Sequence, residues 1–192
     1  MHQLLGAPGE HAERGMGGVA AIVVADGITP LTVAGLGSRL GRDDAVGLEL
    51  VESLPPIEGV RTVLWEDSDA LTVAGRLLDV EGSALIVDCA EMGLPPGASR
   101  CVDAGEAALV VRGSPISVHG LGLAEAVALS RDLGFLGRLA IFGVQPFDLD
   151  PGCGLSPGLA ALLPELSSAL EDAVRRLLEE ARSGRGDQEV RS

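Results

Sequence analysis

The amino-acid sequence predicts a doubly wound α/β fold, built on a single, mostly parallel, twisted sheet of about five strands with helices on both faces. Three observations lead to this prediction. Short apolar runs typical of buried strands alternate along the chain with segments whose apolar residues recur at helical spacing. The run SALIVDCA, residues 83–90, is apolar enough to lie in the middle of a parallel sheet. The length of 192 residues suits one domain with a substantial core.

Each predicted helix carries a local signal. The segment 43–54 places its apolar side chains on one stripe, and the segment 122–134 ends at a glycine, which favours helix termination. The letters LSPG supply a serine cap and a proline for the first turn of the last helix, which is expected to run to about residue 182 with a bend at Pro164. In chain order, the expected elements are the strand 31–35, the helix 43–54, the strand 60–65, the helix 69–80, the strands 83–90 and 99–103, the helix 122–134, the strand 138–146 and the last helix.

The chain is expected to form one α/β domain, residues 29–183, with two terminal segments. Residues 1–28 are expected to form an N-terminal arm, because the first 15 or so lack periodicity, although the apolar run at 19–25 is also compatible with an extra strand. Residues 184–192 are expected to be a polar tail. No internal repeat or interdomain linker is apparent in the sequence between these segments.

Charge and composition argue against several classes of partner. The formal net charge is −14 and all 14 basic residues are arginine, so a nucleic-acid backbone or an anionic membrane surface is a poor partner. The longest apolar stretch, residues 19–25, is too short to cross a bilayer. Three cysteines without metal-ligand spacing fit a reducing cytoplasm, which is the expected location.

Acidic side chains follow two strands that this fold brings together. Asp43 and Asp44 lie in the loop after the first predicted strand, and Asp88 ends the third. These strands are neighbours in the usual order, and sites in open α/β sheets form beyond the carboxyl ends of strands, so Asp88 and one of the pair should converge. His119 begins the connection into the helix 122–134 at the same edge. Two carboxylates and one imidazole would suit nickel, zinc or iron.

Each of these residues also has a structural interpretation. An aspartate at the start of a helix commonly caps it, so Asp43 is assigned as the cap and Asp44 to the site. Asp88, at a buried strand end, needs a partner, which favours a functional role. A single histidine is more often a hydrogen-bonded structural residue than a ligand, so this reasoning leaves the role of His119 open. Cys89 is expected to be a packed thiol on the opposite face of its strand.

Four stretches resemble, in order, the nickel–iron hydrogenase maturation endopeptidases. GLGSRLGRDDAVGLELVESL, which begins at Gly35, is similar to the glycine-rich opening signature with its acidic pair. LIVDCAEMGLPPG resembles the third strand with its terminal aspartate, and SVHGLGLAEAV resembles the histidine segment. IFGVQPFDLDPGCGLSPGL resembles the last strand, the Gln145-Pro146 turn and the following helix start. The resemblance covers about residues 30–180.

This resemblance implies an endopeptidase that removes the C-terminal extension from the precursor of a hydrogenase large subunit after nickel insertion. It implies that Asp44, Asp88 and His119 contact the nickel, which the precursor presents. A monomeric enzyme is expected, without a nucleic-acid or membrane partner, and no separate catalytic nucleophile is assigned. The chain departs from the family at WEDSDA, residues 65–70, where a glycine-rich turn is usual, and its first 28 or so residues have no counterpart.

Two other functions are kept as alternatives. A dinucleotide-binding domain would place Gly35, Gly37 and Gly41 around the phosphates and Glu66 on a ribose, but the adjacent aspartates would oppose a pyrophosphate. A receiver-type phosphoacceptor domain would use the acidic pair and the aspartate after the third strand. Receivers also carry a lysine after the last strand, and this chain contains no lysine. The dinucleotide-binding domain therefore ranks second and the receiver third.

Overall fold

Within the part of the chain that the structure describes, the sheet has five strands, as the sequence predicts. The computed structural model of the chain describes residues 31–104 and 118–189, with side chains for 31–104 and 122–181. The expected N-terminal arm, including the apolar run at 19–25, lies outside the described residues. The strands are β1 (Leu31–Gly37), β2 (Val60–Glu66), β3 (Ser83–Cys89), β4 (Ser99–Asp103) and β5 (Leu139–Val144).

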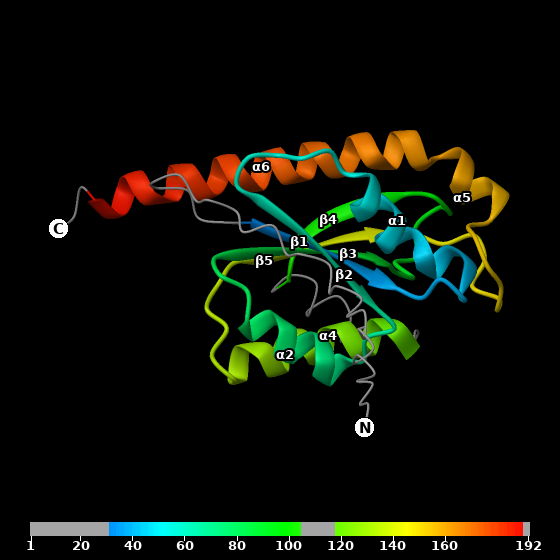
Figure 1. Ribbon diagram of the computed structural model, residues 1–192, viewed down its shortest axis with the longest axis horizontal. Helices are drawn as coiled ribbons and strands as arrows, with labels where there is room; N and C mark the ends of the chain where they lie inside the picture. Colours follow the sequence, from blue (N-terminus) through cyan, green and yellow to red (C-terminus); the bar gives the residue numbers. More distant parts are fainter. Residues whose placement is uncertain (1–30, 105–117, 190–192) are drawn as a thin grey trace, which may run out of the picture.

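The strand order is β2-β1-β3-β5-β4 (Figure 1). All neighbouring strands are parallel except β4, which lies antiparallel to β5 at one edge. The chain passes from β1 to β2 on one side and then returns across β1 to β3 on the other, so the order reverses between β1 and β3. Such a reversal creates the crevice in which open α/β sheets bind ligands, at the carboxyl ends of the two strands. The predicted adjacency of these strands is confirmed.

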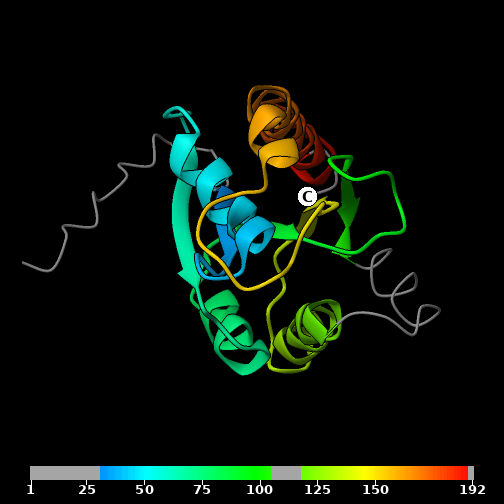
Figure 2. The same cartoon turned by 90° about the vertical axis from the view of Figure 1, so that its right-hand side faces the viewer.

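Helices cover both faces of the sheet (Figures 1 and 2). The helices α1 (Val46–Ser53), α5 (Pro157–Ala161) and α6 (Leu163–Glu189) lie on one face. The helices α2 (Ala70–Leu78) and α4 (Val118–Asp132) lie on the other. This arrangement confirms the doubly wound α/β class. Within the described ranges, no helix is long and apolar enough to cross a membrane.

The central strand β3 is buried on both sides. Successive residues Leu85 and Ile86 are fully buried and belong to different apolar clusters, because side chains alternate across a strand. Leu85 shares its cluster with Leu50 of α1 and Leu170 of α6, whereas Ile86 shares its cluster with Leu77 of α2. This two-sided burial explains the continuous apolar run in the sequence. The last residues of β3, Asp88 and Cys89, are also buried, at the carboxyl edge of the sheet.

Several helix boundaries differ from the predictions, most clearly at the first and last helices. The helix expected over 43–54 begins with a 3-10 turn, η1 (Arg42–Ala45), and continues as an α-helix only from Val46. The last helix is interrupted at Leu162, two residues before the bend expected at Pro164, and is divided there into α5 and α6. Proline lacks an N–H donor and fits the first turn of a helix, so Pro164 lies at the start of α6.

The predicted serine cap is confirmed. The Ser156 hydroxyl accepts a hydrogen bond from the Leu159 N–H at 3.3 Å, at the start of α5. Asp69 caps α2 in the same way, accepting from the Thr72 N–H at 2.8 Å. The helix α6 continues to Glu189, past the expected end near residue 182.

Candidate functional site

The glycines after β1 make room for Asp44. Gly37 has a φ of 134°, a conformation that side chains rarely adopt, and a Cβ there would lie 1.8 Å from the Asp44 carbonyl oxygen. A Cβ on Gly41 would lie 2.9 Å from the Asp44 Cβ. Both glycines therefore let the chain fold tightly around this aspartate at the end of β1.

Asp44 is held at this edge by the backbone of its own loop. It is buried, and its Oδ2 accepts a hydrogen bond from the Ser38 N–H at 2.8 Å. The Arg42 N–H is also engaged, since it donates to the Gly152 carbonyl at 3.0 Å. A dinucleotide-binding loop would direct such amides at a phosphate. Here they are bonded to a carboxylate and a carbonyl, which disfavours the dinucleotide alternative.

Asp88 lies on the neighbouring strand, close to Asp44. It is buried near the end of β3, opposite Gly143 of β5. Burial, and then the negative charge of Asp44, raise the pKa of the Asp88 carboxyl from its ordinary 3.8 to about 7, while a hydrogen bond from the Cys89 backbone acts in the opposite direction. The expected convergence of Asp88 with one aspartate of the pair is therefore observed, and that aspartate is Asp44.

The first turn of α1 keeps the two carboxylates together. A Cβ on Gly47 would lie 2.3 Å from the Val87 carbonyl oxygen and 2.4 Å from the Leu36 carbonyl oxygen. The helix backbone therefore packs directly on the ends of β3 and β1. Because Asp44 lies just before this turn, the close contact fixes it beside Asp88.

His119 lies in the first turn of α4, which begins at Val118, and not in the preceding loop as predicted. The side chain of His119 lies outside the described residues. Among the side chains that the structure describes, no group of three histidine, cysteine, aspartate or glutamate residues is arranged to hold a metal ion. The two-carboxylate part of the predicted set is thus placed, whereas the imidazole remains a prediction.

Asp43 does not cap a helix, and its assignment as a cap is wrong. It is fully buried, and no side chain caps either η1 or α1. Its Oδ2 accepts hydrogen bonds from the N–H groups of Phe147 and Asp148 and from the Ser156 hydroxyl, at 2.8, 2.9 and 2.9 Å. Its Oδ1 accepts from the Ser156 N–H at 2.7 Å. Asp43 therefore ties the loop after β5 to the loop after β1.

Gln145 has a similar role that the sequence did not reveal. Its side-chain oxygen accepts hydrogen bonds from the N–H groups of Met92 and Leu94, at 2.7 and 3.2 Å. Its backbone carbonyl accepts a hydrogen bond from the Gly97 N–H, and its own N–H donates to the Ala98 carbonyl, both at 2.8 Å. The residue after β5 thus holds the loop that follows Asp88. The sequence marked the position, as a polar side chain directly after a buried strand in the Gln145-Pro146 turn, but not the hydrogen bonds that it makes.

Cys89 is a packed thiol, as predicted. It is buried in the apolar cluster on the α1 and α6 side of the sheet. Burial, and to a lesser extent the charge of Asp88, raise the pKa of its thiol. Such a thiol is a poor nucleophile, so Cys89 does not compete with the carboxylates for a chemical role.

The fold and the site together define a class of protein. It is a doubly wound α/β protein whose switch point carries two convergent, buried carboxylates in place of a phosphate-binding loop. Two carboxylates so placed can share a proton or engage a cation. The hydrogenase maturation protease family matches residues 77–181, and the chain belongs to this family.

Individual relatives agree with this membership. The chain is 29% identical over 153 residues to the hydrogenase expression/formation protein HupD of Thiocapsa roseopersicina, a match that spans 78% of this chain and 66% of that protein's length. Its fold is similar to that of an endopeptidase from Escherichia coli, with a TM-score of 0.66 and 25% identity over 77% of this chain and 93% of the other. The hydrogenase maturating endopeptidase HybD from E. coli gives a TM-score of 0.64 and 26% identity over the same shares.

Proposed function

We propose that the chain is an endopeptidase that removes the C-terminal extension of a nickel–iron hydrogenase large-subunit precursor after nickel insertion. Membership of the hydrogenase maturation protease family supports the reaction and the partner. The observation that carries the proposal for the site is the convergence of Asp44 and Asp88 at the switch point. Neither the dinucleotide-binding nor the receiver alternative has comparable support.

The carboxylates serve to engage the nickel that the precursor presents. Two buried carboxylates oppose each other's ionisation, and a cation favours the ionised form of both. Binding of nickel would therefore relieve the repulsion between the ionised carboxylates of Asp44 and Asp88. His119 would add an imidazole ligand. Nickel engaged in this way can act as a Lewis acid on a peptide carbonyl or a water molecule. We assign no separate covalent nucleophile. The site resembles that of an aspartic-type endopeptidase only in that it contains two aspartates.

The proposed location is the cytoplasm and the proposed state is a monomer. All three cysteines are free, which supports a reducing compartment. The net charge of −14 supports a protein partner over nucleic acid.

The substitution His119→Ala is expected to lower the rate of precursor cleavage by roughly 100-fold or more, because it removes the proposed imidazole ligand. The precursor should then accumulate with its extension attached. The measurement is the mass of the nickel-loaded large subunit after incubation with the purified variant, together with the variant's unfolding midpoint.

The matched control replaces the other two histidines, His2 and His11, with alanine. This double variant should process the precursor at the wild-type rate. If a folded His119→Ala protein also cleaves at that rate, His119 does not belong to the site.

A further inference from the structure

Two loops at the carboxyl edge are joined into one unit. They are the β1 loop, residues 38–41, and the β5 loop, residues 145–155. A bridge pairs Gly41 with Gly152, and the Gly152 N–H donates to the Leu40 carbonyl at 2.8 Å. An ion pair at 3.4 Å between Asp148 and Arg42, the first residue of η1, links the β5 loop to the turn that follows the β1 loop. Figure 2 looks onto this edge and shows the β5 loop passing across the end of the sheet beside α1.

The unit is fixed from inside as well as at its surface. The buried carboxylate of Asp43 binds the β5 loop through the N–H groups of Phe147 and Asp148. The ring of Phe147 also lies against the backbone of Gly97 and Gly158, where an added Cβ would approach it to 3.1 and 3.0 Å. These contacts hold the backbone of the unit in place, so its exposed side chains keep their positions at the surface.

Three large apolar side chains of the unit are nevertheless exposed. Leu40 is 67% exposed, Phe147 47% and Leu149 40%. We call these three residues the apolar rim. A fixed loop that displays apolar side chains in water gains nothing for its own fold, and such a group next to a site marks a surface that another molecule covers.

The charges around the apolar rim favour a particular partner. Asp67, whose N–H donates to the Gly37 carbonyl at 3.0 Å, is exposed at the same edge. Asp150 is exposed within the β5 loop. Arg39 and Arg42 flank Leu40, but both are paired with acids: Arg39 with Glu52 and Glu66, and Arg42 with Asp148. The margin of the rim is therefore acidic in sum, and the fitting surface is a protein surface with an apolar centre and basic residues at its margin.

We propose that the apolar rim docks the precursor of the large subunit, on the precursor surface surrounding its nickel. The proposal rests on the proposed function and adds to it the surface that gives affinity. Because Leu40 of the rim lies in the loop that leads directly into η1, which carries Asp44, docking there would bring the precursor's nickel to the carboxylates. A few exposed apolar residues at the centre of an interface commonly account for much of its binding free energy.

The test is a double variant, Leu40→Ser with Leu149→Ser, assayed with nickel-loaded precursor. Its KM should rise by roughly 10-fold or more. The matched control is Leu78→Ser with Leu136→Ser, two leucines that are 43% and 93% exposed and lie far from the carboxyl edge. The control should keep the wild-type KM, and both double variants should keep the wild-type unfolding midpoint. A third variant, Leu40→Met with Leu149→Met, keeps the apolar surface and should restore the wild-type KM.

The possible outcomes distinguish failure of the rim proposal from failure of the proposed function. If the wild type cleaves the precursor and the serine rim variant has the control's KM, the rim does not dock the precursor, although the proposed function stands. If the methionine variant is as weak as the serine variant, the rim's apolar character is not what binds. If the wild type neither binds nor cleaves the precursor, the proposed function fails and the rim proposal with it.

Discussion

Replacing Asp88 with asparagine is expected to abolish precursor cleavage while leaving the metal-free protein at least as stable as the wild type at neutral pH. Asparagine has nearly the same shape as aspartate and its side-chain oxygen can still accept the hydrogen bond from the Cys89 backbone. It carries no charge, so it cannot repel Asp44. Cleavage should fall by roughly 100-fold or more, because a neutral amide is a poor substitute for a carboxylate that engages nickel.

The stability difference should depend on pH in a defined direction. The pKa of the Asp88 carboxyl is raised from 3.8 to about 7 in the folded protein, so protonated Asp88 favours folding. This contribution is complete below pH 3.8 and is lost as the pH rises through about 7. Asparagine does not titrate. The Asp88→Asn variant should therefore match the wild type near pH 4 and exceed its free energy of unfolding by on the order of 1–3 kcal/mol near pH 8.

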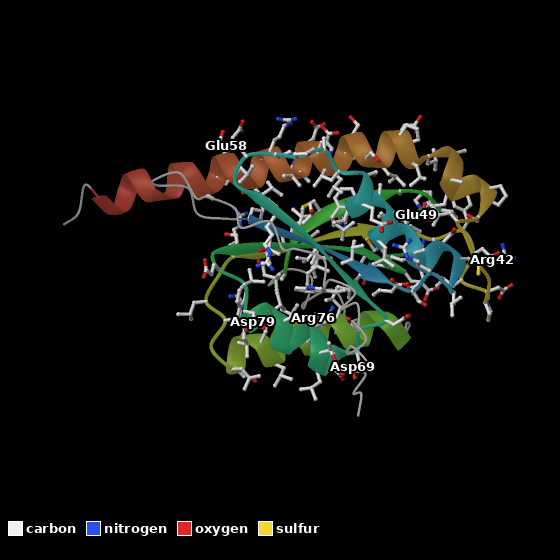
Figure 3. All side chains as sticks on the ribbon, in the orientation of Figure 1. Arg42, Glu49, Glu58, Asp69, Arg76 and Asp79 are labelled. Atoms are coloured by element: carbon white, nitrogen blue, oxygen red, sulfur yellow. The ribbon has the colours of Figure 1, made fainter. Side chains whose placement is uncertain are left out.

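Denaturant unfolding at both pH values in the presence of a chelator measures this difference. Asp79→Asn is a suitable control, because Asp79 is exposed at the end of α2, well apart from Arg42 of the carboxyl edge (Figure 3). The control should show neither the pH-dependent gain nor the loss of cleavage. An Asp88→Asn protein that is less stable than the wild type at pH 8 and still cleaves would mean that Asp88 serves the fold.

Replacing Asp43 with alanine is expected to destabilise the protein by about 3–5 kcal/mol. The substitution removes a fully buried carboxylate that accepts four hydrogen bonds. It leaves three N–H groups and the Ser156 hydroxyl without the carboxylate that accepts their hydrogen bonds. The β5 loop and the start of α5 should loosen together, so cleavage should fall as well.

Asp69→Ala provides the comparison for this measurement. Asp69 is also an aspartate that accepts a hydrogen bond from a backbone N–H, but it is exposed and accepts from Thr72 alone. Its replacement should lower the unfolding midpoint in denaturant far less than Asp43→Ala does. Equal midpoints for the two variants would show that the bonds to Asp43 contribute little to stability.

The parts of the fold that could be predicted from the sequence are those set by local pattern. The apolar run of β3 identifies a central strand because both of its faces are buried. Ser156 and Pro157 locate the start of α5 because a cap acts within a few residues. Asp88 could be placed at a buried strand end because it directly follows the apolar run of β3. The usual strand order then placed it next to the segment that carries Asp44.

The different roles of the adjacent aspartates, Asp44 in the candidate site and Asp43 in holding the β5 loop, could not be predicted in this way. Asp43 is bonded to Ser156, which lies 113 residues further along the chain, and no local pattern reports such a contact. Gln145 likewise acts on Met92, 53 residues earlier. Both residues join separate loops at the carboxyl edge. Their roles follow from how the β5 loop folds over the sheet, which depends on tertiary contacts.

Cleavage of nickel-loaded and nickel-free precursor by the same enzyme preparation is the measurement on which the proposed function depends most. If Asp44, Asp88 and His119 engage nickel that arrives with the precursor, the loaded form should lose its C-terminal extension and the nickel-free form should remain intact. Mass spectrometry of the large subunit after incubation distinguishes the two products. Equal rates of cleavage for the two forms would contradict the proposal, because the carboxylates at the switch point would then have no metal to recognise.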